Sequence, residues 1–388
     1  MTPLRGRDIV CVGFADWDAE LWTNQHHLMS RLAGDNRVLF VESLGLRQPQ
    51  LAARDLKRIW RRLRRGMAPP RAADGLSVLS PLVLPLHRYR AVRAINRRLL
   101  TWTVSRAMRR LGLAHPILWA YVPQAEALAD VLAPSLIVYH CVDDIAAQAG
   151  VDGISFRAAE ERFAARADLV LASAPSLARR LRAVSDDVLD APNVADTAAF
   201  ATALGPGPVD DALEALPRPR IVFTGAVVAT KLDLDLLLAL ARARPSWSFA
   251  LVGPVGPGDP RTDVSALAAE PNVHLLGART YEQLPTILRG AAAGLIPYAI
   301  NELTSSVFPM KVYEYLAAGL PVVATPLPAI ADVDAVATAP DADGIARLLD
   351  EAIAHDSDAR RAERSQIAAG HSWDERLTEI GDAIAARS

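Results

Sequence analysis

Short apolar runs rich in β-branched residues alternate with stretches of helical period along the whole chain, and this alternation limits the possible folds more than any other feature. Repeated strand–helix units favour a parallel sheet with helices on both faces. In the first half, the pattern predicts strands at Asp8–Phe14, Arg37–Glu42, Ser77–Leu84, Ile117–Tyr121, Leu136–His140 and Asp168–Ala172. The helices predicted between them are Glu20–Ala33, Leu51–Arg65, Ala91–Leu111 and Ala158–Ala167.

A stretch rich in Pro and Gly, "ALGPGPVDDALEALPRP" (203–219), interrupts this rhythm and is interpreted as a linker. A second series follows, with strands predicted at Arg220–Thr224, Trp247–Val252, Asn272–Leu276, Gly294–Pro297, Leu320–Ala324 and Asp334–Thr338. Its predicted helices are Leu232–Ala243, Tyr281–Gly290, Pro309–Ala318, Ala342–Ala354 and Ser372–Arg387. We therefore expect an N-terminal domain over 1–202 and a C-terminal domain over 220–371. The final helix, within 372–388, is expected to pack back toward the N-terminal domain.

Two such series in tandem predict an α/β fold in which two doubly wound, Rossmann-like domains face a cleft. Ligands of open α/β sheets bind outside the carboxyl ends of the strands, so substrate contacts are expected on loops that follow strands. Neither first strand is followed by G-x-G-x-x-G, which argues against a dinucleotide-dependent dehydrogenase.

The composition indicates in which cellular compartment the protein is expected and whether it binds a metal. No apolar run approaches the roughly 18 residues of a membrane-spanning helix, and the N-terminus lacks the pattern of a signal peptide. The two cysteines, Cys11 and Cys141, are too few for a disulfide framework. These features lead us to expect a cytoplasmic protein. No group of residues has the spacing of metal ligands, so neither a metal site nor a cofactor is expected.

Lysine is rare in this chain: of 42 basic residues only Lys57, Lys231 and Lys311 are lysines. In "FPMKVYEYLAAGLPVVAT" (308–325), Pro309 is expected at the first position of a helix and Lys311 in its first turn. A cation there is unfavourable unless an anion is bound. Glu314 follows one turn later, where a carboxylate can accept hydrogen bonds from a vicinal diol. A nucleotide-diphosphate site and a surface Lys–Glu pair both fit this pattern.

Lys231 also follows a predicted strand. In "IVFTGAVVATKLDLDLL" (221–237), Gly225 would let a ligand approach the backbone, and Lys231 is expected to open a helix. Two of the three lysines would then occupy equivalent positions after strands of one domain. A solvated Lys231 remains the alternative.

These motifs, together with "LVGPVG" (251–256), "NVHLLG" (272–277) and "YEQLPTIL" (281–288), closely resemble the C-terminal domain of GT-B nucleotide-sugar glycosyltransferases. They are most similar to family 4 and to the related xanthan-type glucuronosyltransferases. The resemblance covers about residues 220–325 with ordered motifs, whereas the N-terminal half shares only the layout. It implies a metal-independent glycosyltransferase with no cofactor and a UDP-, GDP- or dTDP-sugar as donor.

By that resemblance, Lys231 and Lys311 would contact the donor diphosphate and Glu314 its ribose. Family 4 retaining enzymes usually carry a second Glu eight residues before the ribose-binding one, but this chain has Ser306 there, and Glu302 is out of register. The sugar and the stereochemical outcome therefore stay open; the Met310–Lys311 pair resembles the inverting branch. The full set of expected donor-side residues is Gly225, Lys231, Gly253, Gly277, Arg279, Tyr281, Ser305, Ser306, Met310, Lys311 and Glu314.

An inverting enzyme needs a base on the acceptor side, and "LIVYHCVDDIAAQAG" (136–150) offers one after a strand. Adjacent carboxylates repel, which can raise one pKa, so Asp143 is preferred, followed by Asp144 and then His140. A helix cap is the alternative role for either Asp. In "GFADWDAELW" (13–22), the residues expected to line the acceptor side are Gly13, Asp16, Trp17 and Asp18, unless this segment is a cap with a buried Trp17. His26 and His27 are expected to be packing or surface residues.

Between Arg54 and Arg110 the chain has sixteen basic residues and two acids, a local charge of +14. Apolar residues at helical spacing accompany the arginines, which is typical of a peripheral contact with an anionic membrane, here at the inner face of the cell membrane. A solvated helix face is the alternative, and no motif supports nucleic-acid binding. The acceptor is then a glycan or glycolipid in cell-envelope polysaccharide synthesis. A natural-product enzyme with a small-molecule acceptor, or a catalytically silent GT-B subunit, are the alternatives.

Overall fold

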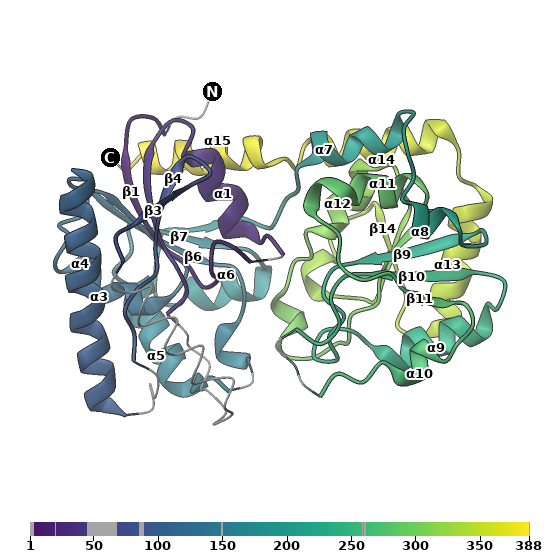
Figure 1. Ribbon diagram of the computed structural model, residues 1–388, viewed down its shortest axis with the longest axis horizontal. Helices are drawn as coiled ribbons and strands as arrows, with labels where there is room; N and C mark the ends of the chain where they lie inside the picture. The colour runs from purple at the N-terminus through teal and green to yellow at the C-terminus, as the bar shows by residue number, and fades with distance from the viewer. Residues whose placement is uncertain are drawn as a thin grey trace. The chain divides into compact units, whose positions relative to one another are not determined.

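The computed structural model describes residues 4–19, 21–44, 68–84, 89–148, 150–257, 259 and 261–387. The chain divides into two compact units: the first comprises Met1–Pro192 and Leu377–Ser388, and the second comprises Asn193–Arg376 (Figure 1).

The first unit is built on an eight-stranded sheet with the order β3-β4-β2-β1-β5-β6-β7-β8. All neighbours pair in parallel except β3 and β4. Its strands are β1 (Asp8–Val12), β2 (Arg37–Val41), β3 (Arg71–Ala73), β4 (Leu76–Leu79), β5 (Ile117–Ala120), β6 (Leu136–Cys141), β7 (Leu169–Ala172) and β8 (Val188–Asp190). Its helices are α1 (Asn24–Leu32), α3 (Arg90–Leu111), α4 (Glu126–Ala129), α5 (Gly153–Ala164) and α6 (Pro175–Leu181).

The second unit has a six-stranded, wholly parallel sheet with the order β11-β10-β9-β12-β13-β14. Its strands are β9 (Arg220–Thr224), β10 (Ser248–Val252), β11 (Val273–Leu275), β12 (Ala293–Ile296), β13 (Val322–Ala324) and β14 (Val336–Thr338). Its helices are α7 (Thr197–Ala201), α8 (Asp211–Glu214), α9 (Leu234–Ala243), α10 (Ser265–Ala268), α11 (Leu284–Arg289), α12 (Lys311–Ala317), α13 (Ala342–Ala354) and α14 (Asp358–Ala369). The last helix, α15 (Trp373–Ala385), begins in the second unit and continues into the first.

Central strands of both sheets are buried on both faces: every residue of β5, β6, β9, β10 and β12 is buried. This explains why they read in the sequence as continuous apolar runs rather than alternating ones. The predicted α/β class and doubly wound topology are confirmed.

Several boundaries differ from the sequence-based expectation. Residues 203–219, expected to be a linker, lie inside the second unit and contain α8. The strands β3 and β8 and the helices α6 and α14 were not predicted individually, because these segments are short or polar. The helix predicted over Leu51–Arg65 lies outside the described residues.

Candidate functional site

The carboxyl edge of the second sheet is shaped first by two glycines. Gly225 follows β9 and Gly253 follows β10, with φ angles of 126° and 158°. A Cβ on Gly253 would lie 1.9 Å from the carbonyl oxygen of Gly225, so only glycine lets the two loops cross this closely. The amide of Gly225 donates to the Val252 carbonyl at 2.8 Å, which fixes the crossing.

The loop after β9 is also joined to the loop after β12. The amide of Ala299 donates to the Lys231 carbonyl at 2.9 Å, and the amide of Asp233 donates to the Pro297 carbonyl at 2.9 Å. Thr325, just after β13, donates from its hydroxyl to the Tyr298 carbonyl at 2.7 Å. Loops from neighbouring strands therefore form one connected rim at this edge.

Lys311 lies at this rim. Its ammonium donates to the Tyr298 hydroxyl at 3.0 Å and lies 5.2 Å and 5.3 Å from the ring centroids of Phe223 and Tyr298. Burial works to lower the pKa of Lys311, yet the surrounding hydroxyls and the Glu314 carboxylate outweigh it and hold the pKa above its ordinary value. A Cβ added to Gly225 would meet this ammonium at 3.5 Å, so the cation faces the bare backbone of the glycine.

Glu314 follows on the same helix and is 6% exposed. Burial raises the pKa of its carboxyl to about 7, although the Lys311 ammonium acts to lower it. Within the described residues, no hydrogen bond or ion pair holds this carboxylate. A buried acceptor of this kind is expensive to leave unsatisfied, and a ligand hydroxyl would satisfy it.

The helix α12 begins at Lys311 rather than at Pro309, and Met310 is its N-cap residue. Bonds of the 3-10 type, from Val312 to the Pro309 carbonyl and from Tyr313 to the Met310 carbonyl, close the turn before it. The shift is within the usual spread of helix ends, and Lys311 remains in the first turn as expected.

Lys231 does not open a helix, contrary to the expectation. It lies in a turn, and α9 begins at Leu234 behind Asp233, whose carboxylate accepts from the Leu236 amide at 2.9 Å. Aspartate is a strong N-cap, so Asp233 sets the helix start at Leu234, three residues after the lysine. The Lys231 side chain is partly exposed, and it makes no ion pair within the described residues.

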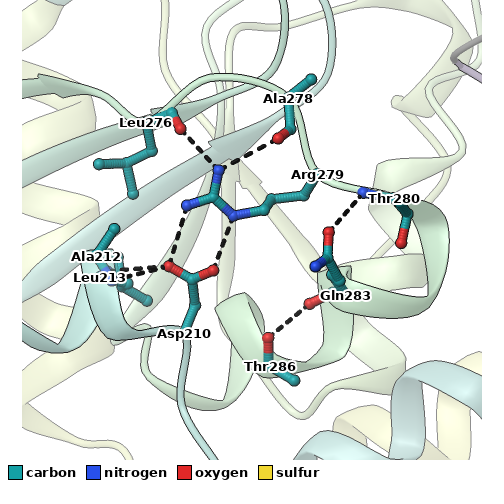
Figure 2. Close-up of polar contacts among 9 residues, drawn as sticks. All are labelled: Asp210, Ala212, Leu213, Leu276, Ala278, Arg279, Thr280, Gln283 and Thr286. Atoms are coloured by element: carbon teal, nitrogen blue, oxygen red, sulfur yellow. Dashed lines mark hydrogen bonds and ion pairs between the residues drawn. The ribbon is translucent and has the colours of Figure 1, made fainter.

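Arg279 is held by the protein itself (Figure 2). Its guanidinium donates to both oxygens of Asp210, at 2.8 Å and 3.2 Å, and to the carbonyls of Leu276 and Ala278, at 2.8 Å and 3.2 Å. The pKa of Asp210 is lowered chiefly by its hydrogen bond with this guanidinium. Arg279 thus fastens the loop after β11 to the start of α8, whose amides Asp210 caps.

The remaining donor-side residues lie in the same unit. Gly277 has a φ of 74°, and a Cβ added to it would meet no other part of the protein within 4 Å. The Tyr281 ring packs edge-on against Phe200, with 5.3 Å between the ring centroids. The Ser305 hydroxyl donates to the Asn301 carbonyl at 2.7 Å, and Ser306 is buried.

In the first unit, the two adjacent aspartates of the loop after β6 differ in burial. Asp144 is buried, and its carboxylate accepts from Arg157 at 2.9 Å and 3.2 Å. Asp143 is partly exposed at the same loop. His140 lies within β6, not after it, and its ring stacks on Tyr121 at 4.9 Å. Asp144 is the residue before the following 3-10 turn, and its side chain makes no capping hydrogen bond there.

In the segment expected to line the acceptor side, the Trp17 side chain packs inside the first unit. This side chain is 2% exposed, its indole donates to Asp74 at 2.8 Å, and its ring packs on Phe40. Asp16 and Asp18 are exposed, and Asp18 pairs with Arg71 at 2.8 Å. Gly13 has no room for a side chain: a Cβ would lie 2.6 Å from Phe40. His26 and His27 are buried, as packing residues are.

A cavity of about 670 Å³ lies elsewhere in the first unit, between α3, α5 and the turn before α4. None of the expected acceptor-side or catalytic residues lines it; its walls include Arg93, Leu100, Phe156 and Arg162. Sequence reasoning also missed Tyr298 and Phe223, the partners of Lys311. The signal for Tyr298 was available, because it directly follows a predicted strand end.

Among the described helices, none combines the length and the apolar character that crossing a membrane requires. The described side chains also contain no group of three or more His, Cys, Asp or Glu that could hold a metal ion.

Residues 218–355 match the family model described as Glycosyl transferases group 1. A curated relative is TuaH of Bacillus subtilis, whose name assigns it to teichuronic acid biosynthesis as a glycosyltransferase; it is 29% identical over 227 residues, which cover 54% of this chain and 55% of the relative. The chain thus spans about half the length of this relative.

The whole chain is similar in structure to sucrose-phosphate synthase of Thermosynechococcus elongatus, with a TM-score of 0.70, 16% identity and 98% of each chain covered. It is also similar to Anabaena HepE solved with UDP and glucose, with a TM-score of 0.67, 13% identity, and 97% of this chain and 99% of that chain covered. The fold is therefore GT-B, as the sequence resemblance predicted.

Proposed function

We propose that this chain, whose residues 218–355 form a glycosyl transferases group 1 domain in a GT-B fold, transfers a sugar from a nucleoside-diphosphate sugar to an acceptor. Lys311 binds the diphosphate next to the backbone of Gly225, which carries no side chain, and the carboxylate of Glu314 accepts hydrogen bonds from the ribose hydroxyls. Lys231, on the connected rim, adds a second positive charge to the diphosphate. The two cations offset the negative charge that develops on the diphosphate as it leaves.

The observation that carries this proposal is the pairing of Lys311 with Glu314. A cation that faces a bare glycine backbone lies one helical turn from a buried carboxylate at the carboxyl edge of a parallel sheet. No side chain or amide in the described part of the chain hydrogen-bonds to this carboxylate. A surface Lys–Glu pair would be exposed on both sides. Here Glu314 is 6% exposed, which supports a site over a solvated pair.

A UDP-sugar is the donor that we propose first, because the structural neighbour HepE was solved with UDP, with UDP-glucose and with UDP and glucose. For the acceptor we propose a lipid-linked glycan, which the similarity to TuaH supports. A protein that acts on such an acceptor would work at the inner face of the cell membrane, and the basic segment Arg54–Arg110 is the part that we propose for the lipid contact. Residues 54–67 and 85–88 of this segment lie outside the described residues.

Asp143 is the base in this proposal. It removes the proton from the acceptor hydroxyl, the oxygen attacks the anomeric carbon, and the bond to the diphosphate breaks with inversion. Asp144 is less suited, since Arg157 already occupies its carboxylate.

A two-step experiment tests the proposal. Thermal shifts with UDP, GDP, dTDP and ADP sugars identify the donor, and the release of nucleoside diphosphate with and without a membrane lipid extract then measures turnover. We expect stabilisation by one base class and release that depends on the extract. Stabilisation without any release would indicate a silent subunit, and an absence of stabilisation by every nucleotide would refute the donor site.

A further inference from the structure

The outer face of α3 has an unusual composition. Five residues, Ile95, Arg98, Trp102, Arg106 and Arg109, follow one another at spacings of three or four, so they lie on one face of this 22-residue helix. All five are exposed, Ile95 to 44% and Trp102 to 54%. In Figure 1, α3 is the long helix on the outside of the first unit.

The charges on this face are not balanced. The helix contains no Asp or Glu. Within the described residues, Arg98, Arg106 and Arg109 make no ion pair, whereas Arg97, on another side of the helix, pairs with Asp130 at 2.9 Å. Along the face, the Arg106 guanidinium lies over the Trp102 ring, at 5.8 Å from its centroid. Three cations are thus available to an external anionic partner.

We propose that this face of α3 binds the surface of an anionic lipid bilayer, with the helix lying parallel to the membrane plane. The arginines pair with lipid phosphates, and the exposed Trp102 and Ile95 enter the boundary between headgroups and acyl chains. This inference deepens the proposed function, because it assigns the membrane contact to named residues. It rests on the proposed function in one respect: the contact would bring the protein to a lipid-linked acceptor.

A lipid surface fits this face better than nucleic acid does. Arginines alone would suit either polyanion, since both present phosphates. The two large apolar side chains decide between them, because tryptophan at the border of a cationic helix face is typical of an interfacial helix. No further aromatic side chain lies on the face to stack on bases.

Cosedimentation of the full chain with vesicles tests this proposal, using pure phosphatidylcholine and phosphatidylcholine with 30% phosphatidylglycerol. We compare the wild type with Arg98→Gln/Arg106→Gln/Arg109→Gln. The control, Arg179→Gln/Arg347→Gln/Arg360→Gln, removes the same charge from exposed arginines that also lack an ion pair within the described residues. Each lost arginine should weaken partitioning roughly 5-fold, so the α3 variant should bind on the order of 100-fold less tightly while the control stays near wild type.

Three outcomes overturn the assignment. These are wild-type binding that ignores lipid charge, equal loss in the two triple variants, and preferential binding to double-stranded DNA over vesicles. Emission of the wild type should shift to the blue on anionic vesicles, and Trp102→Phe should abolish most of that shift. UDP affinity, measured in parallel, should be the same in the wild type and in every variant. If the wild type did not bind UDP, that result would count against the donor site and not against the membrane contact.

Discussion

The Glu314 carboxyl has a pKa near 7 against an ordinary value of 4.5, because it is buried. The unfolded chain releases this proton near pH 4.5, whereas the folded protein keeps it until about pH 7. The group therefore lowers stability progressively as the pH rises through this window, and its effect is constant above pH 7. Glu314→Gln cannot ionise. We expect its free energy of unfolding in urea to fall less between pH 5 and 7.5 than that of the wild type; parallel curves would contradict the burial of a titrating group.

Asp143 and Asp144 allow a direct test of the base, because their surroundings differ. Asp143→Asn should reduce turnover by a factor on the order of 10² or more and leave UDP affinity intact. Asp144→Asn should chiefly weaken the contact with Arg157 and lower the melting temperature. Steady-state kinetics and thermal melts of both variants separate these effects. Full activity in both would remove the base from this loop, and loss in Asp144→Asn alone would move the role by one residue.

At the scale of elements, the crossing of the loops after β9 and β10 depends on a residue without a side chain. Gly253→Ala places a Cβ 1.9 Å from the Gly225 carbonyl oxygen, and backbone cannot yield easily there. We expect a loss of about 3 kcal/mol or more in the free energy of unfolding, at the upper end for single substitutions. Gly205→Ala is the control, since its Cβ would have 3.7 Å of clearance. Equal stability of the two variants in urea would contradict the close crossing.

The Arg279–Asp210 pair joins two other elements, and its bidentate geometry suggests a strong coupling (Figure 2). Asp210 also caps α8 through the amides of Ala212 and Leu213. Asp210→Asn and Arg279→Gln should each cost about 1–3 kcal/mol, and the double variant should cost clearly less than their sum. Urea unfolding of the four proteins measures the coupling, and strict additivity would show that the two groups act independently.

Elements with a strong apolar pattern could be predicted from the sequence, and those set by tertiary contacts could not. Strand β9 and helix α13 match their predicted bounds, because one is a buried apolar run and the other has a regular amphipathic period with Asp341 as its cap. The expected helix start at Lys231 was wrong, because the cap residue Asp233 follows it. The partners of Lys311 come from β9 and from the loop after β12, far apart in sequence, so no local pattern could pair them.

At the scale of the whole molecule, the chain passes between its units twice, at Pro192–Asn193 and at Arg376–Leu377. On the side of the second unit these connections meet, since Ala195 pairs with Ser372 and its amide donates to the His371 carbonyl at 3.2 Å. The nearby Asn193 amide group donates to the Phe308 carbonyl at 2.9 Å, just before α12. The connections are therefore attached to the segment that carries Lys311. The sequence could not reveal this boundary, because the marked interruption in composition lies further along the chain, at 203–219.

The central claim is that the edge around Lys311 binds a nucleoside diphosphate, and calorimetric titration of UDP, GDP and dTDP tests it most directly. We predict that one of them binds the wild type and that Lys311→Ala weakens its affinity by at least about 10-fold, since a charge-assisted contact contributes about 1.5–3 kcal/mol. Arg347→Ala, which removes an exposed cation elsewhere in the second unit, should bind as the wild type does. Affinity within about 2-fold of wild type in Lys311→Ala, a difference of only about 0.4 kcal/mol, would contradict the account.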